Sequence, residues 1–580
     1  MGKIIPLKKF IAREWYPGNK TGSTGLPFYA EPPRLFSKKD EKTFWILDFH
    51  WPRGLSPMGS VFLEDCDAFA AQEAAEKFAI PPTRGMMHRW VGPHVYKSQI
   101  LVESPWEIQR REQRFRATVA PFLENFSKIW QGYTDEIMEG LKYFEEYNLE
   151  KASFPEELRR LIEEARNFHK RCWQIHFEVM YPLSSNYVAF RQLAIELGIE
   201  SNEVPKMLQG YDTKFVETDK ELWRLARLAK QLGLQEIFLR KRLEQIPREL
   251  EKNHSGKTWL QQFATFMAIY GWRTEGISDI MLPSWIEDST PPLGNIKTFL
   301  MRGTYYDFDA SRKEALEVRE RTVQLALQKI ANEEDRKKFT IMLEVNRKAN
   351  FAWWNDEHNF YIDLRATIPL RRICLEIGKR LAKKKLVLEP DDTLFMFYPE
   401  LIDTLEDPKS FDWNRMRRLV KARKKYYYHW RDKRSKLPKL VGAVPTEVTD
   451  PVFIEIFGIH HAFLESIRHE DEKVEELIGV PASQGVAEGR ARVLHTAEKL
   501  HEVLPNEILV CEATSPNWTP AFTKIAACVC DGGGTLTHAA IISREYGIPC
   551  VVGTAIATKQ IKNGQMVRVD GTKGTVRIYK

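Results

Sequence analysis

The chain has 580 residues, 43% of them hydrophobic and 12% aromatic, so it has room for several domains with apolar cores. Lysine and arginine (86) exceed aspartate and glutamate (79) by only seven, and the two signs are interspersed, so charge does not indicate a nucleic-acid partner. No run of about 20 apolar residues predicts a membrane span, the start MGKIIPLKKFIAREW lacks the apolar core of a signal peptide, and the seven cysteines contain no C-x-x-C pair. We therefore expect a protein of the reducing cytoplasm.

The first 105 residues are predicted to be rich in loops and strands. Residues 1–40 contain many Gly, Pro and Lys, and the stretch 80–96, IPPTRGMMHRWVGPHVY, has the proline and glycine rhythm of an ordered loop that leads into a hairpin. His50, Arg84 and His88 are polar residues among aromatics. Either they are histidines at the edge of the core and an arginine bonded to backbone carbonyls, or they line a pocket for a flat, partly apolar ligand.

The middle of the chain is predicted to be helical. From Trp106 to about Leu250, apolar residues recur at steps of three and four, which is typical of core-facing helices. The stretch Tyr270–Glu275 (YGWRTE) interrupts this pattern. Its Arg273 and Glu275 are either part of a site or a structural ion pair.

A second helical region follows over Ser311–Phe360. Glu344 and Arg347 are three residues apart and therefore share a helix face, either as a solvated surface pair or facing a pocket. The basic, aromatic segment Arg415–Lys436 resembles a nucleic-acid-binding helix in composition, but no recognition motif accompanies it. We predict a solvated helix there.

A change of composition marks the last part of the chain. Pro438–Thr449 reads as a proline-glycine linker, a short helical piece follows to residue 476, and a small glycine-rich β/α domain begins at 477. We predict an α+β protein with a mostly helical substrate-binding domain (1–437), a linker with a short helix (438–476) and a terminal domain (477–580). The strands expected in that terminal domain are Arg490–Val493, Glu507–Cys511, Ala526–Val529, Cys550–Val552, Met566–Val569 and Thr575–Ile578.

The stretch 531–554, DGGGTLTHAAIISREYGIPCVVGT, is the strongest functional signal. It reads as a strand, a glycine loop, and a short helix that His538 opens. Free N–H groups and the helix dipole favour an anion there and keep an imidazole ring neutral and nucleophilic, as a phosphoryl acceptor must be. The alternative is a histidine that only caps a tight turn.

This stretch resembles the phosphohistidine signature of the PEP-utilising enzymes, which include PEP synthase, enzyme I of the phosphotransferase system and the rifampicin phosphotransferases. The matching residues are Gly533, Gly534, His538–Ile541 and Arg544–Pro549. The resemblance implies that His538 becomes phosphorylated, that Gly533, Gly534, Thr537 and Arg544 surround the phosphate, and that the domain swivels between two active sites. Many members have threonine two residues before the histidine, where this chain has Leu536, a form more similar to rifampicin phosphotransferases and phenylphosphate synthase.

Residues 1–475 resemble the large subunit of phenylphosphate synthase and the substrate domain of rifampicin phosphotransferases. The shared stretches are HWPRGLSP, IPPTRGMMH, and YGWRTE leading into PSWIED. We find no ATP-grasp domain, no phosphate-binding P-loop and no PEP-binding barrel. In phenylphosphate synthase the nucleotide binds a separate subunit, so the resemblance implies that ATP and Mg²⁺ bind an ATP-grasp partner and that this chain holds no metal.

The implied reaction has two steps. His538 takes the β-phosphoryl group of ATP and then passes it to the hydroxyl of a phenol or similar small alcohol. The predicted substrate-binding residues are His50, Arg84, His88, Arg273, Glu344 and Arg347, with Arg84 on the phosphoryl oxygens and a histidine accepting the hydroxyl proton. The rival interpretations are a carrier that phosphorylates another protein, as enzyme I does, and a non-catalytic assembly subunit.

Overall fold

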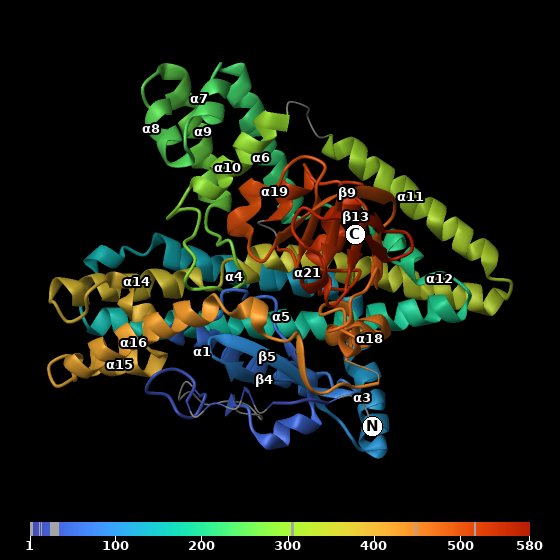
Figure 1. The fold of residues 1–580 in the computed structure, drawn as a ribbon, viewed down its shortest axis with the longest axis horizontal. Helices are drawn as coiled ribbons and strands as arrows, with labels where there is room; N and C mark the ends of the chain where they lie inside the picture. The colour runs from blue at the N-terminus through green and yellow to red at the C-terminus, as the bar shows by residue number, and fades with distance from the viewer. Residues whose placement is uncertain are drawn as a thin grey trace.

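The computed structural model describes residues 4–579 except 8, 11, 13, 24–33, 303–306, 447, 449, 516 and 517. Helices predominate, and two mixed sheets lie on either side of the long helix α5 (Glu156–Glu196) (Figure 1). The α+β class predicted from the sequence is confirmed. No helix in the described part of the chain combines the length and apolarity that crossing a membrane requires.

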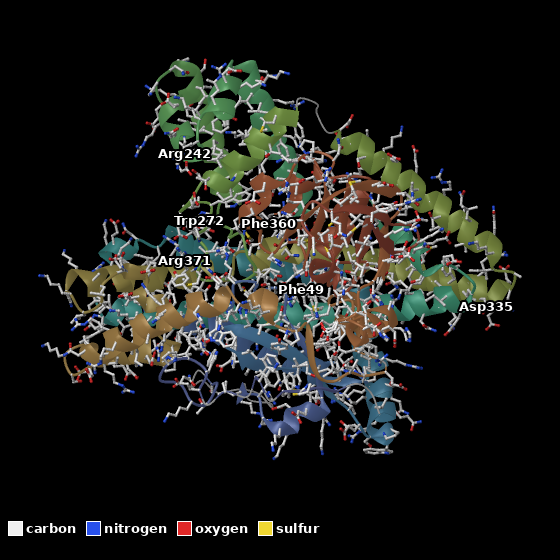
Figure 2. All side chains as sticks on the ribbon, viewed as in Figure 1. Phe49, Arg242, Trp272, Asp335, Phe360 and Arg371 are labelled. Carbon is white, nitrogen blue, oxygen red and sulfur yellow. The ribbon has the colours of Figure 1, made fainter. Side chains whose placement is uncertain are left out.

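The first sheet is built mostly from the N-terminal hundred residues. Its strand order is β1-β6-β3-β5-β4-β2, antiparallel except where β2 pairs with β4. The strands are β1 (Ile4–Ile5), β2 (Arg34–Leu35), β3 (Phe44–Leu47), β4 (Thr83–Val91), β5 (His94–Leu101) and β6 (Leu440–Ala443). The expected hairpin is β4–β5, whose turn contains Gly92 at φ +59°. Phe49, which follows β3 and is labelled in Figure 2, lies where this sheet meets the terminal domain.

Helices make up most of the remaining N-terminal domain, as predicted. Those before residue 275 are α1 (Pro57–Asp65), α2 (Gln72–Lys77), α3 (Pro105–Glu124), α4 (Phe126–Glu146), α5, α6 (Lys214–Gln231), α7 (Gln235–Arg240), α8 (Ile246–Leu250) and α9 (His254–Tyr270). Those after it are α10 (Thr290–Arg302), α11 (Phe308–Lys329), α12 (Glu333–Lys348), α13 (Phe351–His358), α14 (Ile368–Lys383), α15 (Tyr398–Glu406) and α16 (Trp413–Arg431). Short 3-10 turns and two π-helical turns, η2 (Cys66–Ala71) and η7 (Asn359–Asp363), join them.

Helix α16 carries the basic segment that we predicted to be a solvated helix. Its apolar residues Trp413, Met416 and Val420 are buried at steps of three and four, and its lysines lie on the outer faces. The helix begins at the cap Asp412, whose side chain accepts a hydrogen bond from the backbone N–H of Arg415. This placement is that of a packed surface helix.

The terminal domain is organised around a second sheet, in the order β7-β14-β13-β9-β10-β11-β12-β8. Strands β9 to β12 run parallel, and the strands beyond them at either side are antiparallel. The strands are β7 (Glu476–Ile478), β8 (Val480–Ser483), β9 (Val486–Leu494), β10 (Ile508–Cys511), β11 (Ala527–Cys530), β12 (Cys550–Val552), β13 (Met566–Asp570) and β14 (Thr575–Ile578), with helices α19 (Thr519–Phe522), α20 (His538–Glu545) and α21 (Ala557–Gln560). Five of the six strands predicted from the sequence are present within one residue, β9 begins four residues before the predicted start at Arg490, and β7 and β8 were missed.

The stretch expected to be a linker is more ordered than its composition suggested. Residues 440–443 form β6, which pairs with both β1 and β3 and so completes the first sheet. The Pro and Gly residues around this short apolar run are typical of a loop, which is why the sequence predicted a linker. Glu447 and Thr449 of the expected linker lie outside the described residues. Helices α17 (Pro451–Glu455) and α18 (His461–Arg468) then lead into the terminal domain.

A buried ion pair joins the two domains. Arg434, in the turn after α16, donates to Glu512 after β10 through Nε (3.0 Å) and Nη2 (2.7 Å), and Lys439 lies 2.9 Å from the same carboxylate. Burial alone would raise the pKa of Glu512. The positive charges of Arg434 and Lys439 instead hold this pKa well below its usual range. The terminal domain is therefore docked on the rest of the chain.

Candidate phosphohistidine site

His538 is the first residue of α20, directly after the glycine loop, as the sequence predicted. Thr537 caps the helix with extended backbone, and its hydroxyl donates to the carbonyl of Gly534 at 2.9 Å. Gly533 has φ +101°, and a Cβ there would lie 2.9 Å from Oγ1 of Thr537, so the loop needs glycine at this position. The loop thereby fixes the start of the helix and the position of the imidazole ring.

Two threonine hydroxyls contact the ring of His538. Oγ1 of Thr514 lies 2.8 Å from Nδ1, and Oγ1 of Thr519 lies 3.3 Å from Nε2. A hydroxyl group can either donate or accept, so these two contacts fit either neutral tautomer of the ring. Burial, with a further contribution from the positive charge of Arg273, lowers the pKa of His538 to about 3. The ring is thus neutral at physiological pH.

Thr514 was not identified from the sequence. The family threonine two residues before the histidine is replaced by Leu536, whose side chain is fully buried. A hydroxyl nevertheless reaches the ring, from the loop after β10. Pairing of β10 with β11 brings that loop beside the glycine loop. The sequence did contain one signal for Thr514. It follows β10, and β10 pairs with β11, the strand that leads into the glycine loop.

The glycine loop is docked on three segments that lie outside the terminal domain. Asn355 of α13 donates from Nδ2 to the carbonyl of Leu536 at 2.7 Å. The ring of Phe49 covers Gly532, where a Cβ would approach it to 3.0 Å. The backbone N–H of Gly533 donates to the carbonyl of Phe457 at 3.1 Å. His538 is therefore presented to the helical domain.

Arg273 is the cation whose charge reaches His538. Its guanidinium lies over the rings of Trp285 (3.8 Å) and Phe215 (5.1 Å) and is 3% exposed. Its Nε and Nη1 atoms have no hydrogen-bond partner among the described residues. Burial lowers the pKa of Arg273 to about 10, so the side chain is charged at neutral pH. A buried cation whose charge acts on His538 and whose Nε and Nη1 atoms are unpaired is of the kind that can hold phosphoryl oxygens.

A cavity of about 620 Å³ lies between α6, α11 and α13 on one side and α20 and β8 on the other. Its wall includes Ile541 and Ile542, one turn beyond His538, and Phe215, which contacts Arg273. Six carboxyl groups also line it, those of Asp212, Asp219, Asp307, Glu314, Asp356 and Glu545. This volume is in the range of small-molecule sites.

Two carboxyl groups of the cavity, Asp219 and Asp356, have pKa values near neutral pH. Burial raises the pKa of Asp219 to about 7, against the opposing charge of Arg273. Burial likewise raises the pKa of Asp356 to about 6. A carboxylate of this kind can take a proton from a hydroxyl group at neutral pH.

His50 and His88 belong to one buried polar network. Nδ1 of His50 lies 2.6 Å from Oδ1 of Asp48, and Lys97 bridges Asp48 (2.8 Å) to Asp67 (3.0 Å). His88 lies 3.9 Å from Asp67, and burial lowers its pKa well below the usual value. The proximity of Phe49 to Gly532 places His50 next to the glycine loop.

The structure does not bring Arg84, Glu344 or Arg347 to this site. Arg84 pairs with Glu76 (2.7 Å) and with Glu107 on the outer surface, so the expected convergence with His50 and His88 is not found. Glu344 is exposed, and Arg347 lies 3.1 Å from Glu320 of α11. Arg544 lies at the far end of α20 from His538 and donates to the carbonyl of Ala482 at 2.9 Å, at the cavity wall.

Comparison with known proteins identifies the two parts of this arrangement. Residues 503–574 match the family described as PEP-utilising enzyme, mobile domain, and residues 175–356 match the rifampicin phosphotransferase fourth domain. The chain therefore carries a mobile domain of the PEP-utilising kind behind a segment of the rifampicin phosphotransferase kind, which confirms the resemblance seen in the sequence.

Three curated relatives show how far the similarity extends. The chain is 27% identical over 566 residues to the uncharacterized phosphotransferase YvkC of Bacillus subtilis, covering 95% of this chain and 64% of that protein. It is 28% identical over 335 residues to the rifampicin phosphotransferase of Bacillus subtilis (57% and 36%). It is 48% identical over 116 residues to the phosphoenolpyruvate synthase of Pyrococcus furiosus (19% and 14%). The chain thus spans less than two thirds of the length of each.

Proposed function

We propose that this chain is a phosphotransferase that carries a phosphoryl group on Nε2 of His538 and transfers it to the hydroxyl of a phenol or similar small alcohol. The observation that carries the proposal is the neutral ring of His538, which Thr514 contacts and on which the charge of the buried, partly unpaired guanidinium of Arg273 acts. The names of the relatives, two phosphotransferases and a phosphoenolpyruvate synthase, support the same class of reaction.

In the first step, the lone pair on Nε2 attacks the β-phosphorus of ATP held by an ATP-grasp subunit or domain with Mg²⁺. The N–P bond forms as the anhydride bond between the α- and β-phosphates breaks and AMP leaves; water then hydrolyses the bond between the β- and γ-phosphates, and the γ-phosphate leaves as inorganic phosphate. This step needs the terminal domain to leave its docked position, and the single connection through α18 permits a swivelling motion. Gly533, Gly534 and Thr537 supply the loop and helix start at which the new phosphate is bound.

In the second step, the domain returns to the docked position described above. Arg273 holds the phosphoryl oxygens, and the acceptor occupies the cavity that begins one turn beyond His538. Its hydroxyl oxygen attacks phosphorus, the N–P bond breaks, Nε2 regains its lone pair, and the hydroxyl proton passes to Asp219. The aromatic walls Phe215 and Trp353 suit a flat ring.

A second candidate for the proton acceptor is His50. Asp48 accepts a hydrogen bond from its Nδ1, which leaves Nε2 basic, and His50 lies beside the glycine loop. This is the arrangement that the sequence suggested for a histidine base. The two candidates differ in the pH dependence that they impose on transfer.

The test uses the full chain, a co-purified ATP-grasp protein and ATP labelled at the β-phosphate. We expect acid-labile, base-stable label on the chain, absent in His538→Ala, and its loss to a small-molecule fraction when phenols or alcohols are added. Label that persists in His538→Ala contradicts the assignment of the nucleophile. Label that passes from His538 to another protein instead contradicts the small-molecule acceptor and favours a phosphocarrier.

A further inference from the structure

Three buried ligand-type side chains meet behind the docking face of the glycine loop. They are His176 in the middle of α5, His358 at the end of α13 and Asp363 in η7, the turn that contains the labelled Phe360 (Figure 2). None is more than 4% exposed. The sequence expectation was that this chain holds no metal, and the three residues are too far apart along the chain to suggest a site by their spacing.

Their ligand atoms lie at distances that a metal ion can span. Nε2 of His176 is 3.8 Å from Oδ1 of Asp363, Nε2 of His358 is 3.4 Å from Oδ2, and one ligand atom from each residue lies within 4.8 Å of the others. Four ligands about 2.1 Å from a tetrahedral metal are about 3.4 Å apart, so small side-chain movements complete the geometry.

The hydrogen bond of His358 fixes which nitrogen faces the cluster. Nδ1 lies 2.9 Å from the carbonyl oxygen of Trp354, which can only accept, so Nδ1 carries the proton. In the neutral ring, Nε2 then presents a lone pair toward the carboxylate of Asp363. Two acceptors facing each other in a buried site require a positive charge between them. A carbonyl behind a metal-binding histidine is the usual orienting partner.

The remaining atoms of the cluster also lack partners. Nδ1 of His176 and Oδ1 of Asp363 make no hydrogen bond to any described residue, although both are buried. Unsatisfied buried polar atoms are uncommon and costly. A bound cation would satisfy the carboxylate oxygen directly, and His176 would contribute a ring nitrogen.

We propose that His176, His358 and Asp363 form a binding site for one divalent transition-metal ion. Two imidazoles and one carboxylate suit Zn²⁺, Fe²⁺, Co²⁺ or Mn²⁺, whereas Mg²⁺ and Ca²⁺ prefer sites made only of oxygen. Three protein ligands leave at least one coordination position open. The site is distinct from the nucleotide-bound Mg²⁺ of the proposed first step, and it does not depend on phosphorylation of His538.

The experiment measures binding of Co²⁺ and Zn²⁺ to the chelator-treated full chain, by absorption spectroscopy for Co²⁺ and calorimetry for Zn²⁺. We expect one ion per chain, with ligand-field bands of nitrogen and oxygen ligands. His176→Gln and Asp363→Asn should each weaken binding by at least about 100-fold, because loss of a ligand costs no less than loss of an orienting group. Circular dichroism checks that both variants remain folded.

A thiol cluster provides the matched control. Cys511, Cys528 and Cys530 also approach within 4.8 Å of one another, inside the apolar core beneath α20. Cys528→Ser should leave Co²⁺ binding and its spectrum unchanged. Four results would each overturn the proposal: thiolate charge-transfer bands, loss of binding in Cys528→Ser, undiminished binding in His176→Gln, or no binding at all. In the last case His358 and Asp363 would be an imidazolium–carboxylate pair.

Discussion

The hydroxyl of Thr514 lies 2.8 Å from Nδ1 of His538, 24 residues further along the chain. The contact joins the loop after β10 to the first residue of α20. In the proposed mechanism this contact orients the imidazole ring so that Nε2 receives the phosphoryl group. Many PEP-utilising enzymes have a threonine two residues before the histidine. In this chain the hydroxyl comes instead from Thr514, in the loop after the neighbouring strand β10.

Replacing Thr514 tests this role. Thr514→Val keeps the shape of the side chain but removes the hydroxyl, so we expect the rate of His538 phosphorylation to fall about 10- to 100-fold, as for the orienting partner of a metal-bound histidine. The free energy of unfolding should fall by only about 1 kcal/mol, the net value of one hydrogen bond. Thr514→Ser, which restores the hydroxyl, should recover most of the rate. Equal rates in the valine and serine variants would contradict the orienting role.

Substitution of Arg273 should separate the two half-reactions. In the proposed mechanism Arg273 meets the phosphoryl oxygens only in the docked state, so Arg273→Ala should keep His538 phosphorylation and lower transfer to the acceptor at least about 100-fold. Quench-flow measurement of label on the chain and in the product follows both steps.

Arg84→Ala is the matched control for that experiment, because Arg84 pairs with glutamates on the outer surface. We expect both half-reactions to proceed normally in this variant. Similar losses in the two arginine variants would show that Arg273 has no specific role in transfer.

The low pKa of His538 predicts how phosphorylation depends on pH. With a folded-state pKa of about 3, compared with 6.5 for an ordinary histidine, the ring stays neutral throughout the range from about pH 8 to about pH 5. Label incorporation should be flat over that range once the nucleotide-binding partner is saturating. Below pH 6.5 only the unfolded chain gains this proton, so the contribution of His538 to stability, present above pH 6.5, is lost as the pH falls toward 3. Loss of labelling with a midpoint near pH 6.5 would contradict a neutral buried ring.

Transfer to the acceptor should have a different pH dependence. Asp219, with a pKa of about 7, accepts a proton only above that value, so single-turnover transfer from phosphorylated His538 should fall as the pH drops from 8 to 6. Asp219→Asn should lower transfer about 100-fold and abolish this dependence. His50→Gln should leave the pH profile in place; a profile lost in His50→Gln and kept in Asp219→Asn would assign the proton to His50 instead.

The terminal domain could be predicted almost completely from the sequence, because its signals are local. Short apolar strands separated by turns gave the strand positions, and the glycine loop followed by His538 gave the start of α20. The two strands that were missed, β7 and β8, pair at the edges of the sheet. Residues 440–443 were predicted to be part of a linker for a related reason. They form a strand because they pair with β1 and β3, which are some 400 residues away in the sequence.

The partners of the site were harder to predict because they depend on tertiary contacts. Arg273 was one of several polar residues in a stretch between helices, and only the fold shows that its charge reaches His538. Arg84 belonged to an equally suggestive motif, but its neighbours on the first helices are glutamates at the surface. Asp219 and Thr514 carry no motif. Their importance follows from burial and from proximity to the cavity or the ring.

The ion pair between Arg434 and Glu512 bears on how a docked domain can still be released. Two charges buried together recover their hydration when they separate, and this offsets much of the attraction that is lost. Such a pair fixes the orientation in which the domain returns while adding little to the free energy of holding it there. A junction closed by apolar side chains of the same size would bind more tightly and slow every cycle, so the charged junction favours repeated departure and return over permanent attachment.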